Sequence, residues 1–195
     1  MIRFLAVLVT VGVSVAAPAP RDSQGPYFPI RKGDTRVYET CHGDLKDEHT
    51  EVVTGVENRK GTLRVTHGWL SDGEPRNLTT VIVSSEGVFN VIAENAEEQL
   101  LAPILKFPLK PGESWVVERG PDPFGTPFLR KTYTVGREEE IEVPAGRYKT
   151  FCIECVEEIG DATYRGKQWH SPVVGLVKRI EEEHAETLKS FIRGK

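Results

Sequence analysis

Short stretches of alternating apolar and polar residues, separated by glycine turns, constrain the fold of this chain more than any other feature. Residues 62–66 and 79–83 alternate cleanly, and residues 131–135 and 148–156 are strand-like as well. Turn signals such as Ser71-Asp72-Gly73 recur at the spacing of β-hairpins. The pattern predicts an all-β fold of about ten or eleven strands, in an antiparallel, strongly curved sheet that forms a half-barrel or flattened barrel.

One stretch has a helix-forming composition. Residues 94–106 read ENAEEQLLAPILK, and Pro103 interrupts them. Because proline disrupts the interior of a helix, we expect an extended loop here with at most one or two helical turns.

An internal repeat refines this prediction. Residues 28–39 read FPIRKGDTRVYE and residues 107–118 read FPLKPGESWVVE, with five identical positions and an offset of 79 residues. A fainter similarity links the runs that begin at Gly87 and Gly175. We interpret the repeat as two similar halves, residues 28–106 and 107–195, that close one core within a single β domain. The alternative is chance similarity, since proline and glycine punctuate any β protein.

The N-terminus has the layout of a secretory signal peptide over residues 1–17. Arg3 precedes an uncharged apolar run of 14 residues, and cleavage after Ala16 or after Ala17 fits the small residues there. Such a run is short for an uncleaved anchor, which is the alternative. Residues 18–27 (PAPRDSQGPY) predict a flexible lead-in. We therefore expect an exported protein, periplasmic or extracellular, that is soluble and has no transmembrane segment after cleavage.

The charge balance excludes one class of partner. The chain has 25 Lys and Arg against 29 Asp and Glu, a formal charge of −4, which argues against binding nucleic acid through bulk positive charge. With 38% hydrophobic and 28% charged residues, the composition is that of a folded, soluble protein.

Several motifs together resemble a known group of proteins. These are FPIRKGDTRVYE at residues 28–39, LKFPLKPGESW at residues 105–115, VPAGRYKTF at residues 143–151, and WHSPVVGLVKR at residues 169–179 with LKSF at residues 188–191. The chain resembles exported bacterial all-β proteins of unknown function, whose pattern has an aromatic-Pro-Leu-Lys-x-Gly opening, a Val-Pro-Ala-Gly-aromatic turn and a Trp-x-x-Pro-x-Val-Gly-Leu-Val-Lys strand. The resemblance implies a barrel-like or half-barrel fold and an envelope location, and it implies no reaction.

Two residues depart from that pattern. Arg36 stands where the resemblance implies Trp, and we expect it to weaken packing in the opening strand. His170 stands where the resemblance implies Tyr, and we expect it to place a titratable ring on the surface.

The three cysteines permit more than one interpretation. Cys152 and Cys155 have the spacing of a redox or zinc motif, but positions i and i+3 of a strand face opposite sides. We therefore expect Cys155 to be buried and Cys152 to point outward. A Cys41–Cys152 disulfide is a further hypothesis, on the condition that their strands are neighbours.

Metal and hydrolase chemistry have weak support. The segment Cys41–His49 gathers Cys, His and carboxylates, and either a metal site or a polar hairpin loop fits it; the ordinary chemistry of turns favours the loop. We predict no metal site and no cofactor. The sequence has no catalytic motif, and the Glu runs 138–140 and 181–183 are interpreted as charged strand edges. The chain is thus predicted not to be an enzyme, with three histidines as the only candidates for hidden catalysis: His67, His170 and His184.

Aromatic residues carry the binding hypothesis. Candidate ligand-binding residues on a curved sheet are Tyr38, Trp69, Trp115, Trp169 and His170. The alternative is that the aromatics simply fill the core. The favoured function is a non-catalytic structural or interaction module that contacts an envelope protein. The second hypothesis is a carrier or sensor of an apolar small molecule held in a half-barrel groove.

Overall fold

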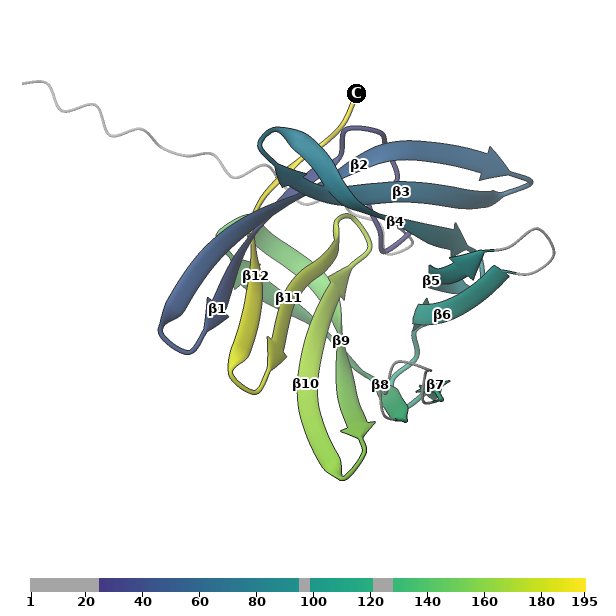
Figure 1. The fold of residues 1–195 in the computed structure, drawn as a ribbon, viewed down its shortest axis with the longest axis vertical. Coiled ribbons are helices and arrows are strands. Elements are labelled where there is room, and N and C mark those ends of the chain that lie inside the picture. The colour runs from purple at the N-terminus through teal and green to yellow at the C-terminus, as the bar shows by residue number, and fades with distance from the viewer. Residues whose placement is uncertain (1–24, 95–98, 121–127) are drawn as a thin grey trace, which may run out of the picture.

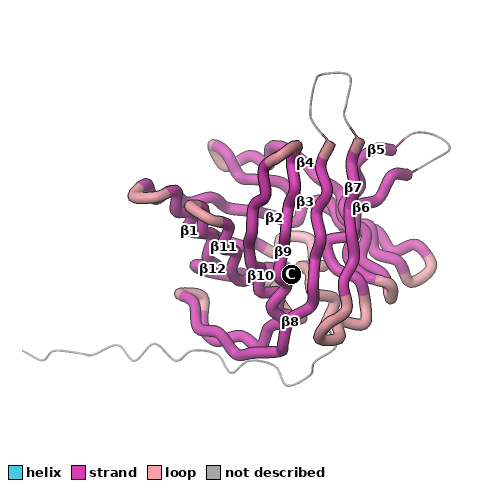
Figure 2. The backbone as a smooth tube through the Cα atoms, turned by 90° about the horizontal axis from the view of Figure 1, so that it is seen from below, coloured by secondary structure: helices cyan, strands magenta, loops and turns pink. Residues whose placement is uncertain are grey.

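The structure, a computed structural model, describes residues 25–94, 99–120 and 128–195. All regular secondary structure in these residues is β-strand (Figure 2). The predicted signal peptide and residues 18–24 of the predicted lead-in lie outside the described residues. The strands are β1 (Thr35–His42), β2 (Leu45–Arg59), β3 (Thr62–Ser71), β4 (Glu74–Ser84), β5 (Gly87–Glu94), β6 (Gln99–Lys106), β7 (Ser114–Arg119), β8 (Leu129–Val143), β9 (Gly146–Ile159), β10 (Ala162–Ser171), β11 (Gly175–Glu181) and β12 (His184–Ile192).

The twelve strands form a single antiparallel sheet in the order β6-β5-β4-β3-β2-β1-β12-β11-β10-β9-β8-β7. Each half of the chain is therefore a six-stranded meander, and the two meanders join where β1 pairs with β12. The edges of the sheet, β6 and β7, are consecutive in the chain, so the sheet curls into a nearly closed barrel with one seam (Figure 1). The all-β, strongly curved fold predicted from the sequence is confirmed, with twelve strands rather than about ten.

The expected loop at residues 94–106 is wrong, because most of it forms β6. Phe89 of β5 pairs with Pro103, and the register shifts between Val88 and Phe89. Proline cannot donate to a sheet ladder, but β6 is an edge strand with a neighbour on one side only, where a missing donor is tolerated.

The two repeat motifs adopt the same local structure. Gly33 and Gly112 have φ values of 87° and 89°, in the region that favours glycine. The Gly33 amide donates to the Val53 carbonyl at 2.8 Å, and the Gly112 amide donates to the Val135 carbonyl at 2.8 Å. Each turn thus anchors the start of its opening strand to the second strand of its own meander. Duplication of residues 28–106 as 107–195 would produce such matching turns, and it stays a prediction.

β-branched and aromatic side chains from both halves fill the main core. Val65 and Val81 of the first half and Ile153 of the second are fully buried. Burial of one such side chain stabilises the fold by about 1.5–3 kcal/mol. Tyr27, the last residue of the predicted lead-in, belongs to this core, with its ring 5.5 Å from that of Phe107. The lead-in over residues 18–27 stays a prediction.

The cysteines correct two further expectations. Cys155 is buried as expected, but Cys152 is buried as well, with Trp169 as its direct neighbour on β10. The Cys41–Cys152 disulfide is not formed, and all three thiols are free. The strands of Cys41 and Cys152 are not neighbours, as such a disulfide would require, because β1 pairs with β2 and β12 whereas β9 pairs with β8 and β10. The described part of the chain has no helix of the length and apolarity that crossing a bilayer requires.

Candidate functional site

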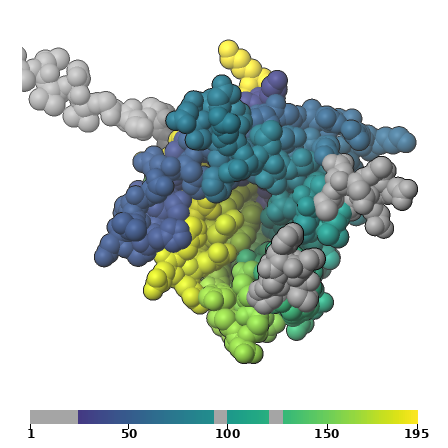
Figure 3. All heavy atoms as spheres, viewed as in Figure 1, coloured from purple at the N-terminus to yellow at the C-terminus, as the bar shows by residue number. Residues whose placement is uncertain are grey.

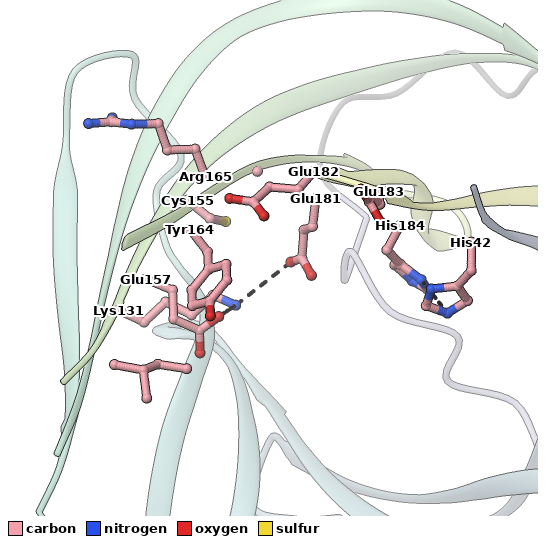
Figure 4. A pocket seen from close by; sticks show the side chains of 12 residues that line it. His42, Lys131, Cys155, Glu157, Tyr164, Arg165, Glu181, Glu182, Glu183 and His184 are labelled. Atoms are coloured by element: carbon pink, nitrogen blue, oxygen red, sulfur yellow. Dashed lines mark hydrogen bonds and ion pairs between the residues drawn. The ribbon is translucent and has the colours of Figure 1, made fainter. Parts of the chain in front are cut away.

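A cavity of about 350 Å³ opens against the second meander and the end of β1. We call it the acidic cavity. In the space-filling view the strands at the C-terminal end of the chain lie between the β1–β2 hairpin and the teal strands of the first half (Figure 3). The polar and aromatic side chains that line the acidic cavity are Lys131, Glu157, Tyr164, Glu181, Glu182 and Glu183, with His42 and His184 at one end (Figure 4).

Lys131 of β8 is the centre of an ion-pair network in this cavity. Its Nζ lies 3.2 Å from a carboxylate oxygen of Glu157 and 3.7 Å from one of Glu181. Lys131 is only 17% exposed, so the pairing is partly shielded from solvent. Strands β8, β9 and β11 are thereby linked by charge across the concave face.

Carboxylates outnumber cations around the cavity. Glu182 and Glu183 occupy the β11–β12 turn and are exposed, and neither takes part in the Lys131 network. Arg165, the second cation of the lining, extends away from Lys131 and Glu181 in Figure 4. The walls between these charges include the exposed Tyr164 ring and Ile159.

The Cys155 thiol also lines the acidic cavity, but it is not reactive at neutral pH. Burial raises its pKa to about 12, so it stays protonated at neutral pH. Burial likewise raises the pKa of the Tyr133 phenol, its direct neighbour on β8. Neither group is a nucleophile or base at neutral pH.

A band of buried polar residues crosses β1 and its neighbours. Arg36 and Glu51 face each other on β1 and β2 and form an ion pair in which Arg36 is 5% exposed. The guanidinium also lies 5.1 Å from the centre of the Phe28 ring. The expectation that Arg36 weakens packing stays a prediction; the structure shows how the charge is accommodated, by an anion and an aromatic face.

His49 of β2 is held at both ring nitrogens. Its Nε2 lies 3.1 Å from the buried Glu186 carboxylate, and its Nδ1 lies 3.2 Å from the Thr40 hydroxyl. The hydrogen bond to Glu186 raises the pKa of His49. Burial alone would raise the pKa of Glu186, but the bond from His49 and the charge of Arg179 hold it below its usual value. The pair is therefore an imidazolium–carboxylate contact in mildly acidic conditions.

His170 is buried, so the expectation that it lies on the surface is wrong. Its Nε2 is 3.1 Å from the Gln168 amide oxygen. Burial first, and then the positive charges of Arg179 and Arg36, lower its pKa to about 3. At neutral pH His170 is therefore an uncharged ring inside the fold, hydrogen-bonded to Gln168, rather than a surface charge.

The aromatic binding candidates do not converge on one site. Tyr38 and Trp115 are buried, and the Tyr38 hydroxyl donates to the Leu176 carbonyl at 2.9 Å. Trp69 is half exposed beside His49, with ring centres 5.4 Å apart. Trp169 alternates with His170 along β10 and so points to the other face of the sheet, where its Nε1 donates to Glu139 at 2.6 Å. A shared ligand site formed by these residues therefore stays a prediction without geometric support.

Sequence reasoning missed the residues that do converge. Lys131 lies in an alternating strand and Glu157 follows one, with nothing in either segment to distinguish them from ordinary outward charges. Glu181 was interpreted as part of a charged edge, whereas it sits opposite His184 and contacts Lys131. The register of distant strands brings them together, and no local motif encodes it.

Comparison with known proteins identifies the fold. No family model and no curated protein matches the sequence. A Bacteroides fragilis protein named as exported and as having a YmcC-like fold matches over 85% of this chain and 98% of its own, with a TM-score of 0.55 and 13% identity. A Parabacteroides distasonis protein named as a lipoprotein matches over 88% of this chain and 100% of its own, with a TM-score of 0.51 and 15% identity. The chain therefore shares its fold with these proteins.

Proposed function

We propose that the protein is an exported, non-catalytic interaction module of the bacterial envelope, and that the acidic cavity binds a basic segment of a partner protein. The observation that carries this proposal is the surplus of carboxylates around a concave, partly hydrocarbon-walled cavity. The names of the two structural neighbours, one exported and one a lipoprotein, support the location.

Lysine and arginine side chains suit such a cavity. Their long hydrocarbon stems pack on apolar walls while the charged ends reach carboxylates. Tyr164 and Ile159 offer the wall, and Glu182 and Glu183 offer charge outside the Lys131 network. Charge complementarity of this kind speeds association and makes it salt-dependent.

A carrier of a hydrophobic ligand is the second candidate. It is favoured by the curved sheet and by the cavity volume of about 350 Å³, which lies within the range of small-molecule pockets. It is disfavoured by the Lys131 ion-pair network in the cavity lining, because a lipid chain that covered these charged groups would remove their remaining water, which is costly.

Titration calorimetry at low salt separates the two candidates. The probes are a lysine hexapeptide, a glutamate hexapeptide and a sixteen-carbon fatty acid. We expect the lysine peptide alone to bind, and the double variant Glu182→Gln/Glu183→Gln to weaken it about tenfold, since exposed charge pairs contribute up to about 1 kcal/mol each.

The matched control removes two turn carboxylates elsewhere. Glu74→Gln/Glu86→Gln changes the net charge equally at the β3–β4 and β4–β5 turns, and peptide affinity should stay within about twofold of wild type. If both double variants lose the same peptide affinity, the loss comes from the overall charge of the protein, and the acidic cavity is not the binding site. Binding of the fatty acid, and not of the lysine peptide, would favour the carrier instead.

A further inference from the structure

His42 and His184 face each other at the junction of the two meanders. They are directly paired across β1 and β12, at the last register position of the β1–β12 ladder. The Nε2 atom of His42 lies 3.0 Å from the Nδ1 atom of His184, and the ring centres are 4.4 Å apart (Figure 4). The two histidines are 142 positions apart in the sequence, and one ring nitrogen of each lies within hydrogen-bond distance of the other.

The spacing of these nitrogens is that of two ligands on one metal ion. Imidazole nitrogens bind transition metals at about 2.0–2.1 Å, so two nitrogens 3.0 Å apart subtend about 95° at a shared ion. That angle is close to the 90° between neighbouring positions of a tetragonal site, the geometry of Cu²⁺ and Ni²⁺. A tetrahedral Zn²⁺ site would place the two nitrogens about 3.3 Å apart.

The backbone around the pair is fixed, and the pair is accessible. The Gly43 amide donates to the Glu183 carbonyl at 3.2 Å, which ties the β1–β2 turn to the β11–β12 turn beside the histidines. His42 is exposed and His184 is half-buried, so an ion can reach both rings from solvent. No group of three or more His, Cys, Asp or Glu side chains in the described residues is placed to hold a metal ion, so the protein would supply two ligands and leave the others to water or a partner.

We propose that His42 and His184 form a two-histidine chelate for a divalent late transition-metal ion, preferring Cu²⁺ to Ni²⁺ and Ni²⁺ to Zn²⁺. On binding, the ring that donates in this contact moves its proton through solvent to its other ring nitrogen, so that both imidazoles stay neutral and each offers one lone pair to the metal. The order of preference follows the geometry and the general affinity order for imidazole ligands. His42 and His184 line one end of the acidic cavity, but a metal bound by the pair does not require that the cavity bind a basic segment.

Metal titration of the full chain tests the proposal. Cu²⁺ and Ni²⁺ are added separately, with Ni²⁺ included because it does not oxidise the free Cys41 thiol. We expect one ion per chain, and a Cu²⁺ electron paramagnetic resonance spectrum with coupling to two imidazole nitrogens. His42→Gln and His184→Gln should each weaken binding at least about 100-fold, because each leaves a single donor in place of a chelate.

The matched control is His49→Gln, which removes a half-buried histidine of the same sheet that already contacts Glu186. It should leave the metal affinity of the protein unchanged. The proposal is overturned if His42→Gln and His184→Gln bind Cu²⁺ as tightly as wild type, or if the spectrum shows fewer than two coupled nitrogens. Circular dichroism of each variant confirms that lost binding does not come from lost folding.

Discussion

Removing Glu51 should destabilise the protein far more than removing the whole Arg36–Glu51 pair. In Glu51→Ala the guanidinium stays buried, with the Phe28 and Tyr38 rings and a weak contact of 3.5 Å to the Val174 carbonyl as its remaining close partners among those described. In Arg36→Met/Glu51→Leu the charges disappear together and apolar groups of similar volume take their place.

The expected magnitudes follow from burial. Arg36 is 5% exposed and Glu51 is 16% exposed, so the arginine charge is buried and the carboxylate is largely shielded from solvent. Breaking such a pair by removing one partner costs about 3 kcal/mol, the low end of the usual range, because the rings and the carbonyl remain. For a chain of this size that loss lowers Tm by about 6–12 °C. The double variant should stay within about 1 kcal/mol of wild type.

Urea unfolding followed by tryptophan fluorescence measures both variants. Glu57→Ala is the matched control, since Glu57 lies on the same strand in an exposed pair with Arg59 and should change the unfolding free energy by less than about 0.5 kcal/mol. A Glu51→Ala variant as stable as Glu57→Ala, or a double variant less stable than Glu51→Ala, would refute the assignment of Arg36–Glu51 as a buried pair.

Three further outcomes are expected. The pKa of His170 is about 3 in the folded state against 6.5 when unfolded, so the unfolded state binds more protons between these pH values. The free energy of unfolding should therefore fall by up to about 1.4 kcal/mol per pH unit as pH drops through that window. His170→Gln should flatten this slope, measured from urea midpoints at several pH values, and an unchanged slope would exclude His170 as its source. A thiol reagent at pH 8 should label one cysteine, Cys41, in the folded protein and all three cysteines in urea, because burial raises the pKa of Cys152 and Cys155. Rapid labelling of all three cysteines in the folded protein would contradict the burial of Cys152 and Cys155. Gly87→Ala should lower Tm strongly, because the new Cβ would lie 2.1 Å from the Leu105 carbonyl oxygen at a φ of 151°. Gly120→Ala is the control, since its Cβ would meet nothing within 4 Å, and equal Tm values for the two variants would contradict this packing.

Local pattern was sufficient to predict the β-strands and their turns. Period-2 alternation around Val65 and Val81, and the strand-like composition of residues 131–135, predict strands whose inward valines are buried, because a half-buried strand requires one apolar face. Pro103 misled the prediction for β6, since proline excludes a helix interior but is tolerated on an edge strand. The edge position of that strand is a property of the whole sheet, which no single segment reveals.

The candidate site could not be predicted in the same way. Lys131 meets Glu181, and His42 meets His184, only because strands from different parts of the chain are placed in register. The aromatic residues were the conspicuous signal in the sequence, yet Tyr38 and Trp115 are committed to the core. Pairing between strands distant in the sequence determines which charges become neighbours, and a single sequence carries no local mark of it.

Nuclear magnetic resonance titration of the ¹⁵N-labelled protein tests the proposed binding role of the acidic cavity most directly. Addition of the lysine hexapeptide should shift the amide signals of Glu157, Tyr164 and Glu181, which lie on three neighbouring strands along the cavity, and the shifts should diminish with added salt. The sixteen-carbon fatty acid should leave those signals in place. Shifts at these amides produced by the fatty acid and absent with the peptide would contradict the interaction module and establish a carrier.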